Sequence, residues 1–242
     1  MDQGGISEEL GMEELSFRAS RLNNITATEM ATLFGLNPYE TPSKLLDKKL
    51  KPQIISSIHL RRGKLKEPSV LEAFKLDMDL ATQRHGEGTV VLKDVRIAAT
   101  PDAYVLDTFN VVECKSVTSR NLEKWYDAIP SQYHVQVLVQ MMVMDSEEGY
   151  IGALEEGDPY ECEYRFVAWK VARNKRIEEL MVQEVARFWD STETLFRVSS
   201  KAKKEMQTFL ESSAGLIYPK EIPIKKELSD EEKLSGILSL FK

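Results

Sequence analysis

The sequence predicts an α/β or α+β fold in which helices flank a central mixed β-sheet. Its 242 residues are 42% hydrophobic and 8% aromatic, which suits one large domain with its own core. Segments with helical periodicity alternate with short runs rich in β-branched residues, in the order helix, helix, helix, strands, helix, strands, helix. The apolar segment 131–144 is too long for a typical strand and is expected to be a buried helix.

The amino-terminal third is predicted to be helical. Thr26 and Glu29 have the spacing of a capping box, and Gly35 provides a helix stop. Pro42 suits the first position of a helix, whereas Pro68 should bend a helix or lie in its early turns. The predicted helices cover residues 15–23, 27–34, 42–50 and part of 54–80.

Most strands are expected in the middle of the chain. Residues 100–105 and 111–117 form a predicted hairpin around a turn at 106–110. Residues 121–127 are a helix or a loop, and in this polar stretch Trp125 and Tyr126 are expected to be the most exposed aromatic pair. An amphipathic helix is expected over 174–189. The other predicted strands cover 89–92, 95–99, 150–154 and 161–169.

Composition divides the chain into three parts. Residues 1–14 are rich in Gly and Glu and are expected to be flexible. Residues 15–199 are expected to form the folded domain. Residues 200–242 carry Lys and Glu runs and end in an amphipathic segment, so they are either a mobile extension with a docking helix or a terminal helix packed on the domain itself.

The expected location is cytoplasmic, with no membrane partner. No apolar run is long enough to cross a bilayer, and the acidic start of the chain is unlike a signal peptide. The two cysteines provide neither a disulfide framework nor a Cys-x-x-Cys metal site. An iron–sulfur cluster is excluded as well, because it needs four cysteine ligands.

The predicted hairpin carries the strongest chemical signal. Residues two apart in a strand share a face, so Glu113 and Lys115 point the same way and Cys114 points into the opposite layer. Asp102, near the start of the neighbouring strand, can reach the same face. Charged pairs of this spacing are common on solvated strands. Here, however, Val111 and Val117 indicate a largely buried strand. Charged side chains are costly to bury there, which favours a functional role for them.

These residues resemble the core motif of the PD-(D/E)XK nuclease superfamily. Further motifs follow in the order seen in lambda exonuclease and the YqaJ-type viral recombinase nucleases. They are Arg21 with residues 25–29, the Gly-x-x-x-Glu segment ending at Glu67, and the Tyr-x-x-Gln segment ending at Gln136. The resemblance covers about residues 16–145 and implies a restriction-endonuclease-like core.

The resemblance implies a hydrolase that depends on Mg²⁺, with Mn²⁺ as an alternative. Asp102, Glu113, Glu67 and the backbone carbonyl of Cys114 would be the metal ligands. Lys115 would orient or deprotonate the attacking water and offset negative charge. Gln136, which is costly to bury in an apolar helix without a partner, would hold the water or the metal shell. Gln140, one turn further on, would either share that role or only contribute to packing.

A second group of residues is implied for a DNA end. Arg21 and Thr28 match the residues that bind the terminal 5′-phosphate in the lambda-type enzymes, with Thr100 as a third candidate. Thr28 replaces the family's serine but keeps the hydroxyl; alternatively, it is only a residue of a first helical turn. Arg120 is a candidate contact to the DNA backbone, although its spacing from Lys115 departs from lambda exonuclease by one residue.

The implied function is a 5′→3′ exonuclease on double-stranded DNA. It would leave 3′ overhangs for phage or prophage recombination in a bacterial host, as a ring-shaped homotrimer with a single-strand annealing protein as partner. The alternatives are an endonuclease or repair nuclease on the same core, or a non-catalytic DNA-binding module. The net charge of −7 is unfavourable for DNA binding, so the clustered cations either line an enclosed channel or form solvated helix faces. These clusters are Lys48, Lys49 and Lys51; Arg61, Arg62, Lys64 and Lys66; Arg173, Lys175 and Arg176; and Lys201, Lys203 and Lys204.

Overall fold

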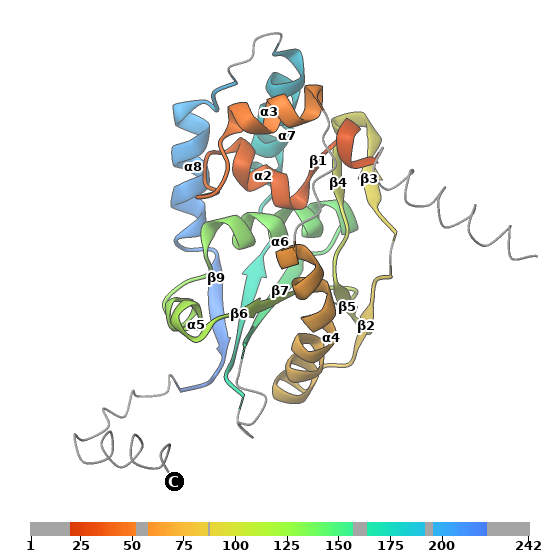
Figure 1. Ribbon diagram of the computed structural model, residues 1–242, viewed down its shortest axis with the longest axis vertical. Coiled ribbons are helices and arrows are strands. Elements are labelled where there is room, and N and C mark those ends of the chain that lie inside the picture. The colour runs from red at the N-terminus through yellow and green to blue at the C-terminus, as the bar shows by residue number, and fades with distance from the viewer. Residues whose placement is uncertain (1–19, 52–57, 87, 157–163, 192–195, 222–242) are drawn as a thin grey trace, which may run out of the picture.

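A six-stranded mixed sheet lies at the centre of the protein, as the sequence predicted (Figure 1). The computed structural model describes residues 20–51, 58–86, 88–156, 164–191 and 196–221. Only β6 and β7 run parallel, and every other neighbouring pair of this sheet is antiparallel. The strands, in their order across the sheet, are β2 (Thr82–Arg84), β5 (Ala103–Val105), β6 (Val111–Val117), β7 (Glu148–Glu155), β8 (Phe166–Ala172) and β9 (Ala214–Tyr218).

A second, three-stranded sheet stands beside the first. Its order is β1 (Ile25–Thr26), β4 (Ile97–Ala99) and β3 (Val90–Leu92), with β1 parallel to β4. The strands predicted at 89–92 and 95–99 are confirmed, with one turn of 3₁₀ helix between them. Their membership in a separate sheet was not predicted, because the two-residue β1 is too short to leave a periodic signal.

Helices cover both faces of the central sheet (Figure 1). One core lies between the sheet and α2, α3, α6, α7 and α8, and the other lies between the sheet and α4. Helix α2 begins with the predicted capping box, in which the carboxylate of Glu29 accepts from the backbone N–H of Thr26 at 2.9 Å. The helices are α2 (Ala27–Leu33), α3 (Pro42–Leu50), α4 (Ile58–Met78), α5 (Ser119–Trp125), α6 (Ser131–Met144), α7 (Lys175–Asp190) and α8 (Ser200–Leu210).

The aromatic pair at the end of α5 is buried, contrary to the prediction. Trp125 is 1% exposed and stacks on Tyr133 with ring centroids 5.6 Å apart. Its carbonyl accepts from the indole N–H of Trp169 at 2.7 Å. Arg120, Asn121 and Lys124 of α5 are exposed, whereas the aromatic pair lies on the inner side of the helix end.

Residues 200–221, which the sequence assigned to the extension, contribute to the sheet and core. Strand β9 pairs with β8, and Ala202 and Met206 of α8 are buried in the larger core. Residues 222–242, which include the predicted docking helix, and residues 1–14, which the sequence predicts to be flexible, lie outside the described residues.

His134 of α6 is enclosed by the same carboxy-terminal elements. It is 2% exposed, its Nε2 lies 3.2 Å from the hydroxyl of Ser213, and its ring contacts that of Phe209. Burial lowers the pKa of His134 from its ordinary value of 6.5 to about 4. The neutral imidazole is therefore the form that the folded protein accommodates.

Protonation of His134 is expected to destabilise the fold in mild acid. Because the pKa is lower in the folded protein, the unfolded chain binds the proton first, and stability falls as the pH drops from about 6.5 toward 4. At pH 4.5 the loss attributable to this group is about 2–3 kcal/mol. Urea unfolding at pH 7 and pH 4.5 measures it, with His134→Gln expected to have a shallower pH dependence. Equal pH dependence in the two proteins would contradict this assignment.

Candidate active site

The central feature is a buried carboxylate on β6. Glu113 and Lys115 project toward α6, whereas Val112 and Cys114 enter the core beside α4, as the alternation of a strand requires. Glu113 is 1% exposed and accepts a hydrogen bond from the ammonium of Lys115. Lys115 also lies 5.1 Å from the ring of Tyr133. The pair thus lies between the sheet and α6.

Two glutamines of α6 complete the environment of Glu113. The amide of Gln136 donates to Oε1 at 2.6 Å, and that of Gln140 donates to Oε2 at 2.5 Å. They are one helical turn apart, so both reach the same strand residue. Both glutamines were candidates from the sequence. The structure adds that each one binds a different oxygen of the same carboxylate. Such contacts fix the orientation of Glu113 and offset the cost of its burial.

Asp102 lies just before β5 and is tied to the backbone of β6. Its Oδ2 accepts from the N–H of Cys114 at 2.8 Å. Burial raises the pKa of Asp102 well above its usual range, and the charge of Glu113 raises it further, against the opposing effect of Lys115. The two carboxylates are therefore close enough to repel each other.

Glu67 approaches from α4 and forms the third acidic group. Burial and the charge of Glu113 raise its pKa, and Arg84 partly offsets them. Arg84 of β2 is missing from the residues that the sequence suggested, and its guanidinium lies 3.6 Å from Glu67. The N–H of His85, the next residue, donates to the carbonyl of Asp102 at 3.1 Å. No sequence signal marked Arg84, because β2 has only three residues.

Lys115 is held in its charged form. Burial alone would lower its pKa, but the attraction of Glu113 and Asp102 exceeds that effect and raises the pKa above its usual range. At neutral pH the group is an ammonium. It is suited to offsetting negative charge and orienting a water molecule rather than to removing a proton.

The donor set fits a hard divalent cation. Asp102, Glu113 and Glu67 come from different parts of the fold, and the charge of Glu113 raises the pKa of both Asp102 and Glu67. Oxygen ligands of this kind suit Mg²⁺. Oε1 of Gln140 is a buried oxygen without a hydrogen-bond partner in the described part of the chain. Within those residues, His, Cys, Asp and Glu side chains do not form a ready cluster of three or more ligands. Glu113 instead accepts hydrogen bonds from Lys115, Gln136 and Gln140.

Three of the candidate phosphate-binding residues, Arg21, Thr28 and Thr100, lie next to strands of the three-stranded sheet. Arg21 precedes β1, and Thr28 is exposed in the first turn of α2. Strand β1 pairs with β4, and β4 leads directly into Thr100, whose hydroxyl lies 3.0 Å from that of Thr89. The pairing of β1 with β4 therefore connects the segment around Arg21 and Thr28 to the segment that ends in Asp102. Arg120 is exposed at the start of α5, after β6.

Several predicted basic residues are neutralised by acids. Arg173 contacts Asp145, Glu147 and Glu178. Arg176 contacts Glu179 and Glu205 in the same region. This cluster is consequently a paired helix face rather than an open basic surface.

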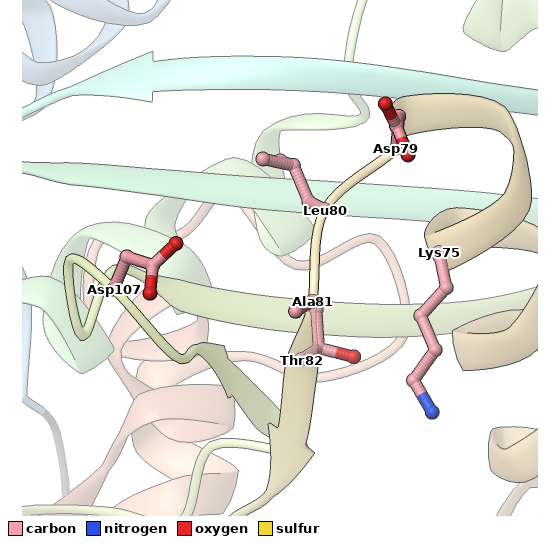
Figure 2. A pocket seen from close by; sticks show the side chains of 6 residues that line it. All are labelled: Lys75, Asp79, Leu80, Ala81, Thr82 and Asp107. Carbon is pink, nitrogen blue, oxygen red and sulfur yellow. The ribbon is translucent and has the colours of Figure 1, made fainter.

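A separate cavity of about 560 Å³ lies at the carboxy-terminal end of α4, around the turn into β2 (Figure 2). None of the predicted site residues lines it. The charged groups of Lys75, Asp79 and Asp107 point in different directions in Figure 2. It has no convergent set of polar groups of the kind that a reaction would need.

Comparisons with known proteins agree with the sequence motifs. The profile of the YqaJ-like viral recombinase domain matches residues 16–147. The uncharacterized protein YqaJ of Bacillus subtilis (strain 168) is 26% identical in an alignment of 182 residues that covers 70% of this chain and 53% of that protein. The match thus spans about half the length of this curated relative.

Solved structures share the fold. An alkaline exonuclease, LHK-Exo, from Laribacter hongkongensis superimposes with a TM-score of 0.57 and 16% identity, over 80% of this chain and 95% of that one. The same enzyme in complex with dAMP gives a TM-score of 0.58, also at 16% identity, over 79% and 93%. A phage related exonuclease from Haemophilus somnus 129PT gives a TM-score of 0.50 at 11% identity, over 76% and 95%. At these identities the likeness shows a common fold.

Proposed function

This chain belongs to the family of YqaJ-like viral recombinase domains, and from that premise we propose that it is a Mg²⁺-dependent 5′→3′ exonuclease on double-stranded DNA. The observation that carries the proposal is the buried Glu113, held by Lys115, Gln136 and Gln140 beside Asp102. Burying so many polar groups for structure alone would be costly, whereas a phosphodiesterase needs acidic and cationic groups at one point.

Asp102, Glu113, Glu67 and the carbonyl of Cys114 are the proposed ligands of the metal. When bound, Mg²⁺ supplies charge stabilisation for the phosphate and activation of water. Gln136 and Gln140 keep Glu113 in place, because each amide holds one carboxylate oxygen. Lys115 offsets charge on the phosphate and orients the attacking water. Mn²⁺ is expected to replace Mg²⁺ in this oxygen-rich site.

The proposed 5′→3′ direction of digestion depends on contacts of Arg21, Thr28 and Thr100 with the terminal 5′-phosphate. Arg120 is proposed to contact the DNA backbone. Arginine can bind a phosphate through two parallel hydrogen bonds. The alkaline exonuclease with the same fold has a complex with dAMP, which is consistent with a nucleotide-containing substrate. The product would be a duplex with 3′ overhangs, ready for a single-strand annealing protein during phage-type recombination.

Digestion of linear duplexes with 5′-phosphate or 5′-hydroxyl ends tests this proposal. The phosphorylated ends are expected to be degraded about 10–100 times faster, since a hydrogen bond to a charged group contributes about 1.5–3 kcal/mol. Arg21→Ala should remove most of this preference. Equal rates on both ends, or cleavage of covalently closed circles, would instead indicate an endonuclease.

We also propose a homotrimeric ring around DNA, in keeping with the resemblance to lambda exonuclease. A ring would let an acidic protein enclose DNA within a locally basic channel. Sedimentation equilibrium should give the mass of three 27.6 kDa chains.

In the described residues, no helix is long and apolar enough to cross a membrane.

A further inference from the structure

A buried lysine lies behind the proposed phosphate-binding residues. The side chain of Lys49, on α3, is 3% exposed. Its ammonium donates to the carbonyl of Arg21 at 2.5 Å, the carbonyl of Asn24 at 2.8 Å and the carboxylate of Glu29 at 2.7 Å. An ammonium has three donors, so these three acceptors satisfy it fully.

These contacts are unusual for a lysine of a short surface helix. Burial lowers the pKa of Lys49, and only the attraction of Glu29 opposes this effect strongly. Lysine is seldom buried without a paired acid. Lys49 follows the buried Leu45 and Leu46 by four and three residues, so it lies on the inner face of α3. A cation on an apolar helix face was the available sequence signal.

The acceptors of Lys49 join the two parts of the proposed phosphate pocket. Arg21 and Asn24 precede β1, whereas Glu29 lies in the first turn of α2 and also accepts from the N–H and hydroxyl of Thr26. The hydroxyl of Thr26 is in turn 3.3 Å from that of Thr28. One ammonium therefore connects the backbone at Arg21 to the turn that carries Thr28.

We propose that Lys49 is a positioning residue for recognition of the DNA end: through the carbonyl of Arg21 and the carboxylate of Glu29, it sets Arg21 and Thr28 at the spacing that a terminal phosphate requires. The inference rests on the proposed function. Lys49 is enclosed by its three acceptors and acts through Arg21 and Thr28 rather than on the phosphate itself. Loss of the ammonium would leave two carbonyls and a carboxylate without their shared donor.

The test compares initial rates on linear duplexes with 5′-phosphate and 5′-hydroxyl ends. Lys49→Met keeps the length of the side chain and removes its charge, and Lys44→Met, an exposed position on the same helix, is the matched control. The rate ratio of at least tenfold expected for wild type and for the control should fall below threefold in Lys49→Met, while the rate on 5′-hydroxyl ends stays within about threefold of wild type. A role in stability alone would lower both rates together and leave the ratio unchanged, which would overturn the inference.

A second variant keeps the test decisive if Lys49→Met does not fold. Glu29→Gln retains an oxygen for the N–H of Thr26 but removes the charge that binds Lys49, so the ratio should again fall at least threefold. An unchanged ratio in folded Glu29→Gln would overturn the inference in that case. If wild type itself does not distinguish the two ends, the proposed end recognition fails, and the role of Lys49 fails with it. If wild type distinguishes them and Lys49→Met does so equally well, only the role of Lys49 fails.

Discussion

Lys115→Met is expected to lower the rate of Mg²⁺-dependent duplex digestion by about 10²–10⁴-fold, the range for loss of a group that acts on the reacting atoms. Methionine has a side chain of similar length but lacks the ammonium that lies over the ring of Tyr133. Glu113 would keep its two glutamine donors, so the protein should remain folded. The rate loss should therefore come from the missing positive charge.

Release of nucleotides from a linear duplex measures the effect, and circular dichroism verifies the fold. Lys170→Met is the matched control. Lys170 is also a strand lysine paired with a glutamate, Glu148, but it lies on β8 and is not part of the proposed active site. The control should digest DNA at the wild-type rate. Activity of Lys115→Met within threefold of wild type would exclude a catalytic role for this lysine.

Asp102→Asn is expected to abolish digestion, by 10³-fold or more, and at the same time to stabilise the protein. The asparagine oxygen can still accept from the N–H of Cys114, so the backbone contact is retained. The substitution removes a charge that burial and Glu113 both disfavour. A gain of about 1–2 kcal/mol in the free energy of unfolding at pH 8 is expected, as is common where active-site strain is relieved.

The pH dependence of this gain follows from the direction of the pKa shift. Because the pKa of Asp102 is raised in the folded protein, its contribution to stability is fully present below the pKa of the unfolded chain and is lost as the pH rises through the folded value. The advantage of Asp102→Asn should therefore grow from pH 4 to pH 8 in metal-free urea unfolding. A variant less stable than wild type at pH 8 would show that the carboxylate of Asp102 is not under electrostatic strain.

The sequence predicted those parts of the fold whose signals are local. The capping box at Thr26, the stop at Gly35 and Pro42 at a helix start each depend on residues a few positions apart, and all three are present. The hairpin was predictable because valines outline β6 while a turn separates it from β5. The helix α6 was predictable from its length and apolar composition.

Contacts between distant elements were beyond such signals. Glu113, Lys115 and Gln136 were suggested one by one, but the choice of Glu113 as the shared acceptor depends on the packing of α6 against β6. Arg84 reaches Glu67 from a strand too short to recognise, and Lys49 finds its acceptors 20 to 28 residues earlier in the chain. Trp125 is buried by Tyr133 and Trp169, which its polar neighbours gave no reason to expect.

The position of β9, well after the proposed catalytic residues, has a consequence for biosynthesis. All the proposed catalytic residues have been synthesised by residue 140, yet β8 gains its partner strand β9 only with residues 214–218. Until then the edge of β8 offers unpaired backbone groups to any other strand, and His134 lacks its cover from Phe209 and Ser213. A nascent chain halted near residue 199 would hold the proposed catalytic groups but keep the edge of β8 unpaired, and it would therefore remain prone to aggregation.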